Sequence, residues 1–364
     1  MGSERLYWLG FNLVAGIGPV RVRRLLEICG TLEAAWIAPM SALKQAELDS
    51  RAIANLRQIR QTVDLESEMA RLDRLGVALI AWDDEDYPAL LSALRVIDQA
   101  PPLLYLRGTL AASDEWAVAV VGTRNVSAYG RQVTYQIAGS LAAAGLTVVS
   151  GLAHGVDTEA HTAALDKGGR TIAVLPCGID EVYPPENRQL ATRIVENGAL
   201  VSVFPPGTAA ESKNFAPRNQ VISGLARGVV VTEAGEKSGA MITANCALEQ
   251  SREVFAVPGN ITAHGSGGTN RLIQDGATPA LSAQDILETF SSDRIVGYVE
   301  ARQSLPALSD DEKTIYDALG ADSFHADEIA RQCDLPVSRV ASALTLLELK
   351  GMIRQVNHMT YARL

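Results

Sequence analysis

Residues 116–125 read Trp-Ala-Val-Ala-Val-Val-Gly-Thr-Arg-Asn, a short apolar run followed by a glycine and polar residues. The run Trp116–Val121 is apolar throughout, which is typical of a strand buried on both faces. The glycine that follows allows a tight connection into a helix. Such a strand, turn and helix predict one unit of a parallel sheet.

The same pattern returns along the chain. Further strands are expected at Leu146–Val149, Thr171–Leu175, Ala199–Val203, Gly228–Thr232 and Glu253–Val257, with helical stretches between most of them. Apolar strands that alternate with helices indicate a parallel sheet covered on both faces. We therefore predict the α/β fold class, with a core over residues 110–290.

Segments of different character flank this core. Residues 1–80 have helical apolar spacing and predict a small helical module. Residues 81–109, which hold an acidic run and several prolines, are expected to connect it to the core. Residues 291–307 are polar, as in a linker. Residues 308–364 predict three helices and a β pair, the pattern of a winged-helix domain.

Length and composition exclude several protein classes. A chain of 364 residues suggests two or three domains, and 47% hydrophobic with 20% charged residues argues against global disorder. We found no apolar run long enough for a membrane span and no secretory pattern at the N-terminus, so we expect a cytoplasmic protein. The four cysteines lack disulfide or zinc spacing and are expected to be buried: Cys29, Cys177, Cys246 and Cys333.

The charge distribution bears on nucleic-acid binding. The formal net charge is −10, and the four segments 1–80, 81–109, 110–290 and 291–364 carry +1, −3, −5 and −3. Phosphate binding depends largely on Lys and Arg, and none of these segments is a basic domain. Any phosphate-binding site must therefore be local.

Glycine and serine follow three of the predicted strands, in Gly122–Asn125, Ser150–Asp157 and Glu233–Ala240. At the start of a helix such residues let backbone N–H groups approach an anion, and the helix dipole adds partial positive charge. The turns together predict a phosphate-binding edge. GxxxxGK[ST] and a strand-borne GxGxxG are missing, so ATPase and dehydrogenase functions lose support and no cofactor is expected.

The segment Pro205–Gln220 is predicted to be a long polar loop. It holds Lys213, Phe215, Arg218 and Asn219. An aromatic ring beside cations suits single-stranded nucleic acid, because bases stack on the ring while the cations hold the backbone. The alternative is that Phe215 is a buried anchor of the loop.

Two other chemistries have weaker support than simpler roles for the same residues. His154, Asp157 and His161 could suggest a metal site, because two of them are four positions apart on one helical face. No third protein ligand has comparable spacing, and a role in capping the following helix is favoured. Ser150 and Ser238 lack the GxSxG context of a nucleophile. We therefore expect neither a metal nor a catalytic serine.

The N-terminal module contains a second candidate phosphate contact. Gly16 and Gly18 form a Gly-x-Gly turn before Pro19, and Arg21 follows. This layout resembles a helix-hairpin-helix, whose turn presents N–H groups to phosphate oxygens. The alternative is a tight turn that only packs two helices.

Many short motifs occur in one order through the core. They are Val121–Arg124, Ser150–Asp157 with Ala160-His161, Pro176–Gly178, Tyr183-Pro184, Phe215–Asn219, Ser238–Ala244, Val257–Gly259 and Asn270–Ala277. With these motifs the sequence resembles the DNA-processing protein A family, also called Smf. The resemblance covers essentially the whole chain and is most specific over Val120–Ala277.

The resemblance implies an extended Rossmann-like core that binds single-stranded DNA without established catalysis. It would be flanked by a SAM or helix-hairpin-helix module and a winged helix. Arg124 would contact a phosphate and Phe215 would stack on a base. The other DNA-binding residues that the resemblance implies are Ser150, Gly151, Arg218, Asn219, Ser238 and Gly239. The residue pattern itself adds Lys213, which need not align with the family's basic residue before the phenylalanine, and Gly16, Gly18 and Arg21 as a secondary contact.

The family resemblance also implies partners. Its members escort incoming single strands in natural transformation, dimerise through the Rossmann-like core, and load the RecA recombinase onto DNA coated by single-strand-binding protein. This chain departs from the family at Gln220, where an arginine is usual, and at Val203, where a glutamate is frequent. One cation and one carboxylate are therefore missing, which bears on the strength of DNA binding.

Two further functions compete with this interpretation. Related folds include phosphoribohydrolases that release a base from nucleoside monophosphates, but their Pro-Gly-Gly-x-Gly-Thr run is absent, and its nearest analogue is Glu233–Gly239. A transcription factor would rest on the winged helix alone. That segment is acidic, so contact with a protein is an equal alternative to DNA reading.

Overall fold

The computed structural model describes two compact units, residues 1–290 and 291–364. The residues described are 2–290, 309–319, 324–333, 335–349, 353–357 and 359–363.

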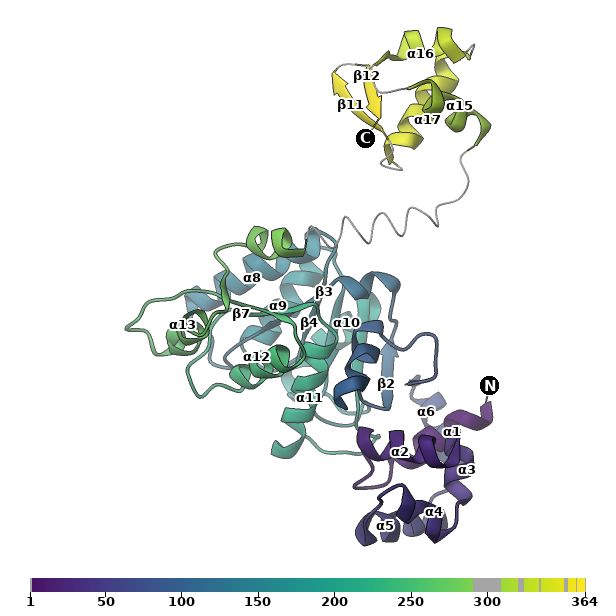
Figure 1. The fold of residues 1–364 in the computed structure, drawn as a ribbon. Coiled ribbons are helices and arrows are strands. Elements are labelled where there is room, and N and C mark those ends of the chain that lie inside the picture. Colours follow the sequence, from purple (N-terminus) through teal and green to yellow (C-terminus); the bar gives the residue numbers. More distant parts are fainter. Residues whose placement is uncertain are drawn as a thin grey trace. The chain divides into compact units, whose positions relative to one another are not determined.

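The first unit is built on one sheet (Figure 1). Its strand order is β1-β2-β6-β5-β4-β3-β7-β8-β9. Strands β3 to β9 run parallel, and all six predicted strands are confirmed to within a residue or two. The bounds are β1 Ala78–Ala81, β2 Leu103–Gly108, β3 Ala117–Val121, β4 Thr147–Ser150, β5 Thr171–Val174, β6 Gly198–Ser202, β7 Gly228–Val231, β8 Glu253–Ala256 and β9 Thr278–Pro279.

The expectation for residues 81–109 was wrong in one respect. This segment does more than connect, because β2 lies within it and pairs antiparallel with both β1 and β6. Tyr105 at the centre of β2 is fully buried, and its hydroxyl donates to Asn12 of the first helix. The acidic run and the prolines made the segment resemble a linker, although it contains a strand that is buried on both faces.

Helices cover both faces of the sheet (Figure 1). Val118 and Val120 pack under α8, α9 and the helix over residues 283–290, whereas Ala119 and Val121 belong to the core under α11 and α12. Alternate residues of β3 are thus buried on opposite faces, as a two-residue period requires. The helix bounds are α8 Ala128–Ala143, α9 Val156–Asp166, α10 Arg188–Asn197, α11 Ser212–Gly224, α12 Gly239–Glu249 and α13 Gly267–Gln274.

The N-terminal helices share a core with the sheet. Trp8 and Phe11 belong to the same apolar cluster as Leu79 and Leu103 of the first two strands. Residues 1–80 are helical as expected, up to β1 at their end. The bounds are α1 Gly2–Asn12, α2 Pro19–Cys29, α3 Leu32–Ile37, α4 Met40–Gln45, α5 Ser50–Thr62 and α6 Leu65–Arg74, with the short α7 at Ala89–Ser92 after β1.

The second unit has the helices and wing that the sequence predicts. Its strands form a small sheet in the order β10-β12-β11. The bounds are α15 Asp310–Ala318, β10 Phe324–His325, α16 Ala326–Cys333, α17 Val337–Leu349, β11 Ile353–Asn357 and β12 Thr360–Arg363. This is a winged-helix arrangement. The predicted linker at 291–307 lies outside the described residues.

Within the described residues, no helix is long and apolar enough to cross a membrane.

The four cysteines are free thiols that differ in burial. Only Cys177 and Cys246 are buried. Cys29 and Cys333 are half-buried, so the expectation of four buried cysteines was wrong for these two.

Candidate nucleic-acid interface

The strand order places the loops of interest next to one another. The chain crosses from β3 to β4, β5 and β6 on one side and then returns to β7 on the other side of β3. In open parallel sheets, ligands bind where the strand order reverses in this way, at the carboxyl ends of the strands. The loops after β3, β4 and β7 meet at this edge, as their sequence predicts.

The start of α8 is occupied by the protein itself. Ser127 caps the helix by accepting a bond from the Gly130 N–H, and Glu233 after β7 accepts bonds from the Ser127 N–H and hydroxyl at 3.0 and 2.9 Å. Glu233 is buried, with 8% of its surface exposed. Its carboxylate takes the place an anionic ligand would take at this helix N-terminus.

The predicted donors at the Ser150-Gly151 turn are also used internally. Ser150 is fully buried and its hydroxyl donates to the Val120 carbonyl. The Gly151 and Ala153 N–H groups donate to the Asp157 carboxylate at 3.2 and 3.3 Å. The prediction that this turn offers N–H donors to DNA is therefore corrected, because an acidic side chain in the first turn of α9 already accepts them.

Arg218 lies beneath the turn instead of on an open loop. The predicted loop at 205–220 becomes helix α11 from Ser212 onward, and Pro217 lies inside this helix. Arg218 is 4% exposed, and its guanidinium is 4.0 Å from the Asp157 carboxylate. A Cβ atom on Gly151 would lie 1.5 Å from Arg218 Nη1, so only glycine leaves room for this side chain.

Burial dominates the electrostatics of this ion pair. It raises the pKa of Asp157, against the stabilising Arg218 charge and the two backbone N–H groups. Burial likewise lowers the pKa of Arg218, while Asp157 acts in the opposite direction. Taking both charges out of water outweighs their attraction at 4.0 Å. The pair therefore fixes the position of Arg218 more than it stabilises the fold.

Phe215 is the centre of a cationic and aromatic cluster. The ring is half-buried, with the Arg124 guanidinium carbon 4.9 Å and the Arg218 guanidinium carbon 5.5 Å from its centroid. Tyr183 meets the ring edge-on at 6.1 Å between centroids. Arg124 is exposed to solvent. The structure thus brings together the predicted Arg124, Phe215 and Arg218, and of these three Arg124 is exposed, Phe215 half-buried and Arg218 buried.

The start of α12 is the open helix N-terminus at this edge. Ser238 caps it by accepting a bond from the Ala240 N–H at 3.3 Å, and Gly239 is exposed, with no neighbouring atom within 4 Å of the place a Cβ would take. Asn219 is buried, and its amide reaches the Gly239 carbonyl at 3.4 Å. Asn219 therefore links α11 to α12. It is buried, contrary to the prediction that it lies on an open loop. Lys213 is exposed and ion-paired with Glu211 at 2.7 Å.

The secondary contact is engaged within the N-terminal module. Gly16 has a positive φ of 93°, and Pro19 after Gly18 begins α2, as the turn pattern predicts. Arg21, however, folds back to the Gly16 carbonyl at 2.6 Å and pairs with Asp49 at 2.5 Å. These contacts favour the alternative of a structural turn.

The histidines have separate environments. His154 is exposed and lies 3.6 Å from Glu186. His161 is fully buried, its Nδ1 is 2.7 Å from the Thr171 hydroxyl, and its Nε2 has no hydrogen-bond partner. Burial, together with Arg218, lowers the pKa of His161 to about 3. Among the described residues, no three His, Cys, Asp or Glu side chains are grouped so that they could hold a metal.

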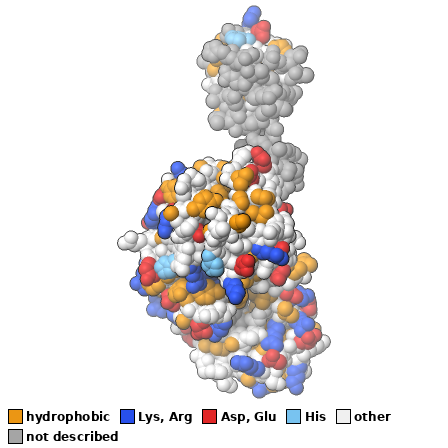
Figure 2. All heavy atoms as spheres, turned by 90° about the vertical axis from the view of Figure 1, so that its left-hand side faces the viewer, with side chains coloured by type: hydrophobic (Ala, Val, Ile, Leu, Met, Phe, Trp, Pro, Cys, Tyr) orange, Lys and Arg blue, Asp and Glu red, His pale blue; other side chains and the backbone are white. Residues whose placement is uncertain are grey.

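Sequence reasoning favoured a capping role at the start of α9, where Asp157 accepts two backbone bonds, but it missed Glu233. Glu233 lies two residues after β7 and reaches the start of α8 from more than a hundred positions away. No local signal marks that contact, although carboxylates are favoured at helix N-termini. On the visible face of the first unit, basic and acidic side chains are interspersed (Figure 2).

The fold and this edge define the class of the protein. It is a Rossmann-like α/β protein in which acidic side chains occupy the helix starts after β3 and β4, while Arg124 and the start of α12 remain open. Residues 78–291 match DNA recombination-mediator protein A, and residues 299–357 match the DprA winged helix domain. The chain belongs to this family.

Relatives and solved structures agree with this assignment. Protein Smf of Synechocystis is 34% identical over 99% of both chains. The X-ray structure of DNA processing protein A from Streptococcus pneumoniae has a TM-score of 0.67 at 33% identity, over 78% of this chain and 97% of that one. A structure that concerns the single-stranded DNA binding mode of DNA processing protein A from Helicobacter pylori has a TM-score of 0.53 at 31% identity, over 60% and 96%.

Proposed function

We propose that this protein binds single-stranded DNA along the edge formed by Arg124, Phe215 and the start of α12. The observation that carries the proposal is the exposed Arg124 guanidinium over the half-buried Phe215 ring. An accessible cation beside an aromatic ring suits a strand whose backbone and bases are both available. The similar DNA processing protein A from Helicobacter pylori, which has a single-stranded DNA binding mode, supports the same ligand.

The accessibility of each residue suggests its role in DNA binding. Arg124 and Lys213 would contact phosphates, and the exposed Gly239 N–H would receive another at the start of α12. The Ser238 N–H already donates to the Gly235 carbonyl at 2.9 Å and its side chain caps α12, so Ser238 would shape this helix start. Phe215 would offer a base the part of its ring that Arg124 and Arg218 leave uncovered. Arg218, with Asn219, Ser150 and Gly151, would hold these groups in place from below, because all four are buried.

Family membership supports extending the proposal to a wider role. In this proposal the protein is a recombination mediator that protects incoming DNA in natural transformation and loads RecA onto strands coated by single-strand-binding protein. It would act in the cytoplasm as a homodimer formed through the Rossmann-like core. The winged helix would serve as an accessory module.

We further propose that the protein is not an enzyme. A phosphoribohydrolase would need to place a nucleotide phosphate at the glycine-rich turns. Glu233 lies at the start of α8, and a Cβ on Gly130 would already be 1.7 Å from its carboxylate. A buried carboxylate at that position repels a phosphate, which disfavours the enzyme alternative. Release of free base from nucleoside monophosphates would contradict this part of the proposal.

A salt-dependent titration tests the DNA site. A fluorescent single strand and the matching duplex are titrated at two salt concentrations with the parent protein, Arg124→Ala and Arg74→Ala. Arg74 is exposed at the end of α6 and is not one of the residues of the proposed edge. Loss of one phosphate contact should weaken binding and reduce the salt slope for a single strand by about 0.7, in Arg124→Ala alone.

A second variant tests the ring. Phe215→Leu retains apolar volume but removes the aromatic face, and it should weaken single-strand binding by about 1–3 kcal/mol. Mass measurement of the complexes gives the stoichiometry. If Arg124→Ala and Phe215→Leu both bind single strands like the parent, the proposed edge is not the DNA site.

A further inference from the structure

A cavity of about 550 Å³ lies at the opposite edge of the sheet, where the parallel strands begin. Ala78 and Leu106, which are paired across β1 and β2, line it together with Ile172 of β5. The chain on either side of this sheet face, residues 84–90 and 108–115, forms the walls. This volume lies within the roughly 300–1,000 Å³ that is usual for small-ligand sites.

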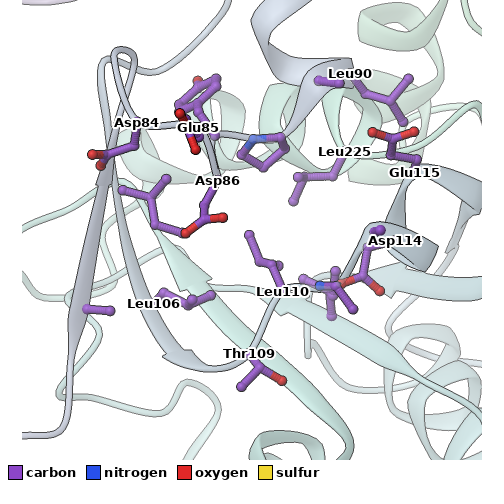
Figure 3. Close-up of a pocket in the computed structure, with 18 of the residues that line it drawn as sticks. Asp84, Glu85, Asp86, Leu90, Leu106, Thr109, Leu110, Asp114, Glu115 and Leu225 are labelled. Carbon is purple, nitrogen blue, oxygen red and sulfur yellow. The ribbon is translucent and has the colours of Figure 1, made fainter. Parts of the chain in front are cut away.

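Its chemistry differs from that of the DNA edge. Figure 3 shows Leu106, Leu110 and Leu225 between two acidic walls. Asp84, Glu85 and Asp86 come from one wall, whereas Asp114 and Glu115 come from the other (Figure 3). The cavity thus has an apolar middle and carboxylates on separate sides.

Two of these carboxylates are already neutralised. Asp84 pairs with Arg5 at 2.9 Å, and Asp114 pairs with Arg170, also at 2.9 Å. Arg5 is the one cation among the residues that line this cavity. Within the described chain, three lining carboxylates form no ion pair or side-chain hydrogen bond, and we call them the unpaired carboxylates: Glu85, Asp86 and Glu115.

We propose that this cavity binds a linear aliphatic polyamine. Ammonium groups at separate positions along such a molecule complement unpaired carboxylates on both walls, and the methylene groups between them fit the leucine-lined middle. A single divalent cation needs several oxygen ligands close together. The described residues hold no grouping of three or more acidic, histidine or cysteine side chains of that kind.

The site is independent of the DNA-binding proposal, because it lies at the other edge of the sheet and has the opposite charge. A polyamine bound there would also be separate from polyamine on the DNA. The ligand must therefore be measured on the protein without DNA. Arg124→Ala should weaken single-strand binding and leave polyamine binding unchanged, so failure of either proposal can be recognised separately.

Isothermal titration calorimetry of the full chain with spermidine, at constant ionic strength, tests the proposal. The parent should bind one spermidine in a saturable manner. Glu85→Gln/Glu115→Gln removes one unpaired carboxylate from each wall and should weaken binding about tenfold, which corresponds to about 1.4 kcal/mol. The matched control Glu66→Gln/Glu236→Gln removes two exposed acids that do not line the cavity and should leave affinity within about twofold.

Two further ligands test whether the cavity recognises the shape of spermidine or only its charge. Propylamine has one ammonium and should bind much more weakly than spermidine, and Mg²⁺ should not displace spermidine at equal charge concentration. The proposal is overturned if the parent shows no saturable binding. Equal weakening in the control variant, or equal competition by Mg²⁺, would also overturn it, because each would reduce the effect to general charge screening.

Discussion

Substitution of Arg218 by methionine should destabilise the fold at neutral pH. Arg218 and Asp157 are 4% and 6% exposed and lie 4.0 Å apart. Methionine retains an unbranched apolar stem but no charge. The Asp157 carboxylate would then stay buried without a partner charge. Burial already raises its pKa, and the Arg218 guanidinium, which lowers that pKa, would be gone.

The expected magnitude follows from what remains around Asp157. Removing one partner of a buried ion pair costs about 3–5 kcal/mol. Asp157 still accepts bonds from the Gly151 and Ala153 N–H groups, at 3.2 and 3.3 Å. We therefore expect a loss of about 3 kcal/mol in the free energy of unfolding, at the lower end of that range.

Urea unfolding followed by tryptophan fluorescence measures this loss. Arg218→Met/Asp157→Asn removes both charges and should recover most of it, because a neutral pair of similar volume avoids the cost of desolvation. Arg218→Met alone should also be less destabilising at pH 5 than at pH 8, since protonation neutralises the lone carboxyl. An Arg218→Met variant with parental stability at pH 8 would refute the reasoning and indicate an Arg218 that faces solvent.

Two more predictions concern neighbours of this pair. Gly151→Ala places a methyl group 1.5 Å from Arg218 Nη1 and should lower the free energy of unfolding by about 1–3 kcal/mol in urea melts, whereas Gly239→Ala, with open space around it, should not. Burial lowers the pKa of His161 from 6.5 to about 3, so between these pH values the unfolded chain binds more protons than the folded chain. The free energy of unfolding should therefore fall by about 1.4 kcal/mol for each pH unit by which the pH is lowered through this window. His161→Asn should flatten that slope in unfolding curves at pH 4 to 6.5; an unchanged slope would contradict the assignment.

The occupied helix starts have a general implication for this fold. Asp157 and Glu233 act on the backbone donors of their own chain. A strand that binds this edge must therefore rely on the groups left accessible, mainly Arg124 and the start of α12. In the proposed function, Asp157 and Glu233 are buried and do not face the polyanion at this edge, although the net charge of the chain is −10.

The parallel core and the winged helix could be predicted from the amino-acid sequence alone. The strands from Ala117 to Ala256 are mostly apolar, and such runs are visible in the sequence because burial on both faces favours apolar residues at successive positions. The sequence also predicts which loops meet, since carboxyl ends of parallel strands share one edge. The motifs in these loops identified the family before any contact was known.

The accessibility of the site residues depends on long-range contacts and could not be predicted from the sequence. Arg218 and Asn219 have the same polar character as Arg124 in the sequence, yet they are buried in α11 while Arg124 is exposed. The buried position depends on Asp157, which lies 61 positions away, and on the missing side chain of Gly151. Likewise, β2 became a sheet strand through pairing with β6, almost a hundred residues further on. Contacts of this range come from packing and leave no local pattern to read.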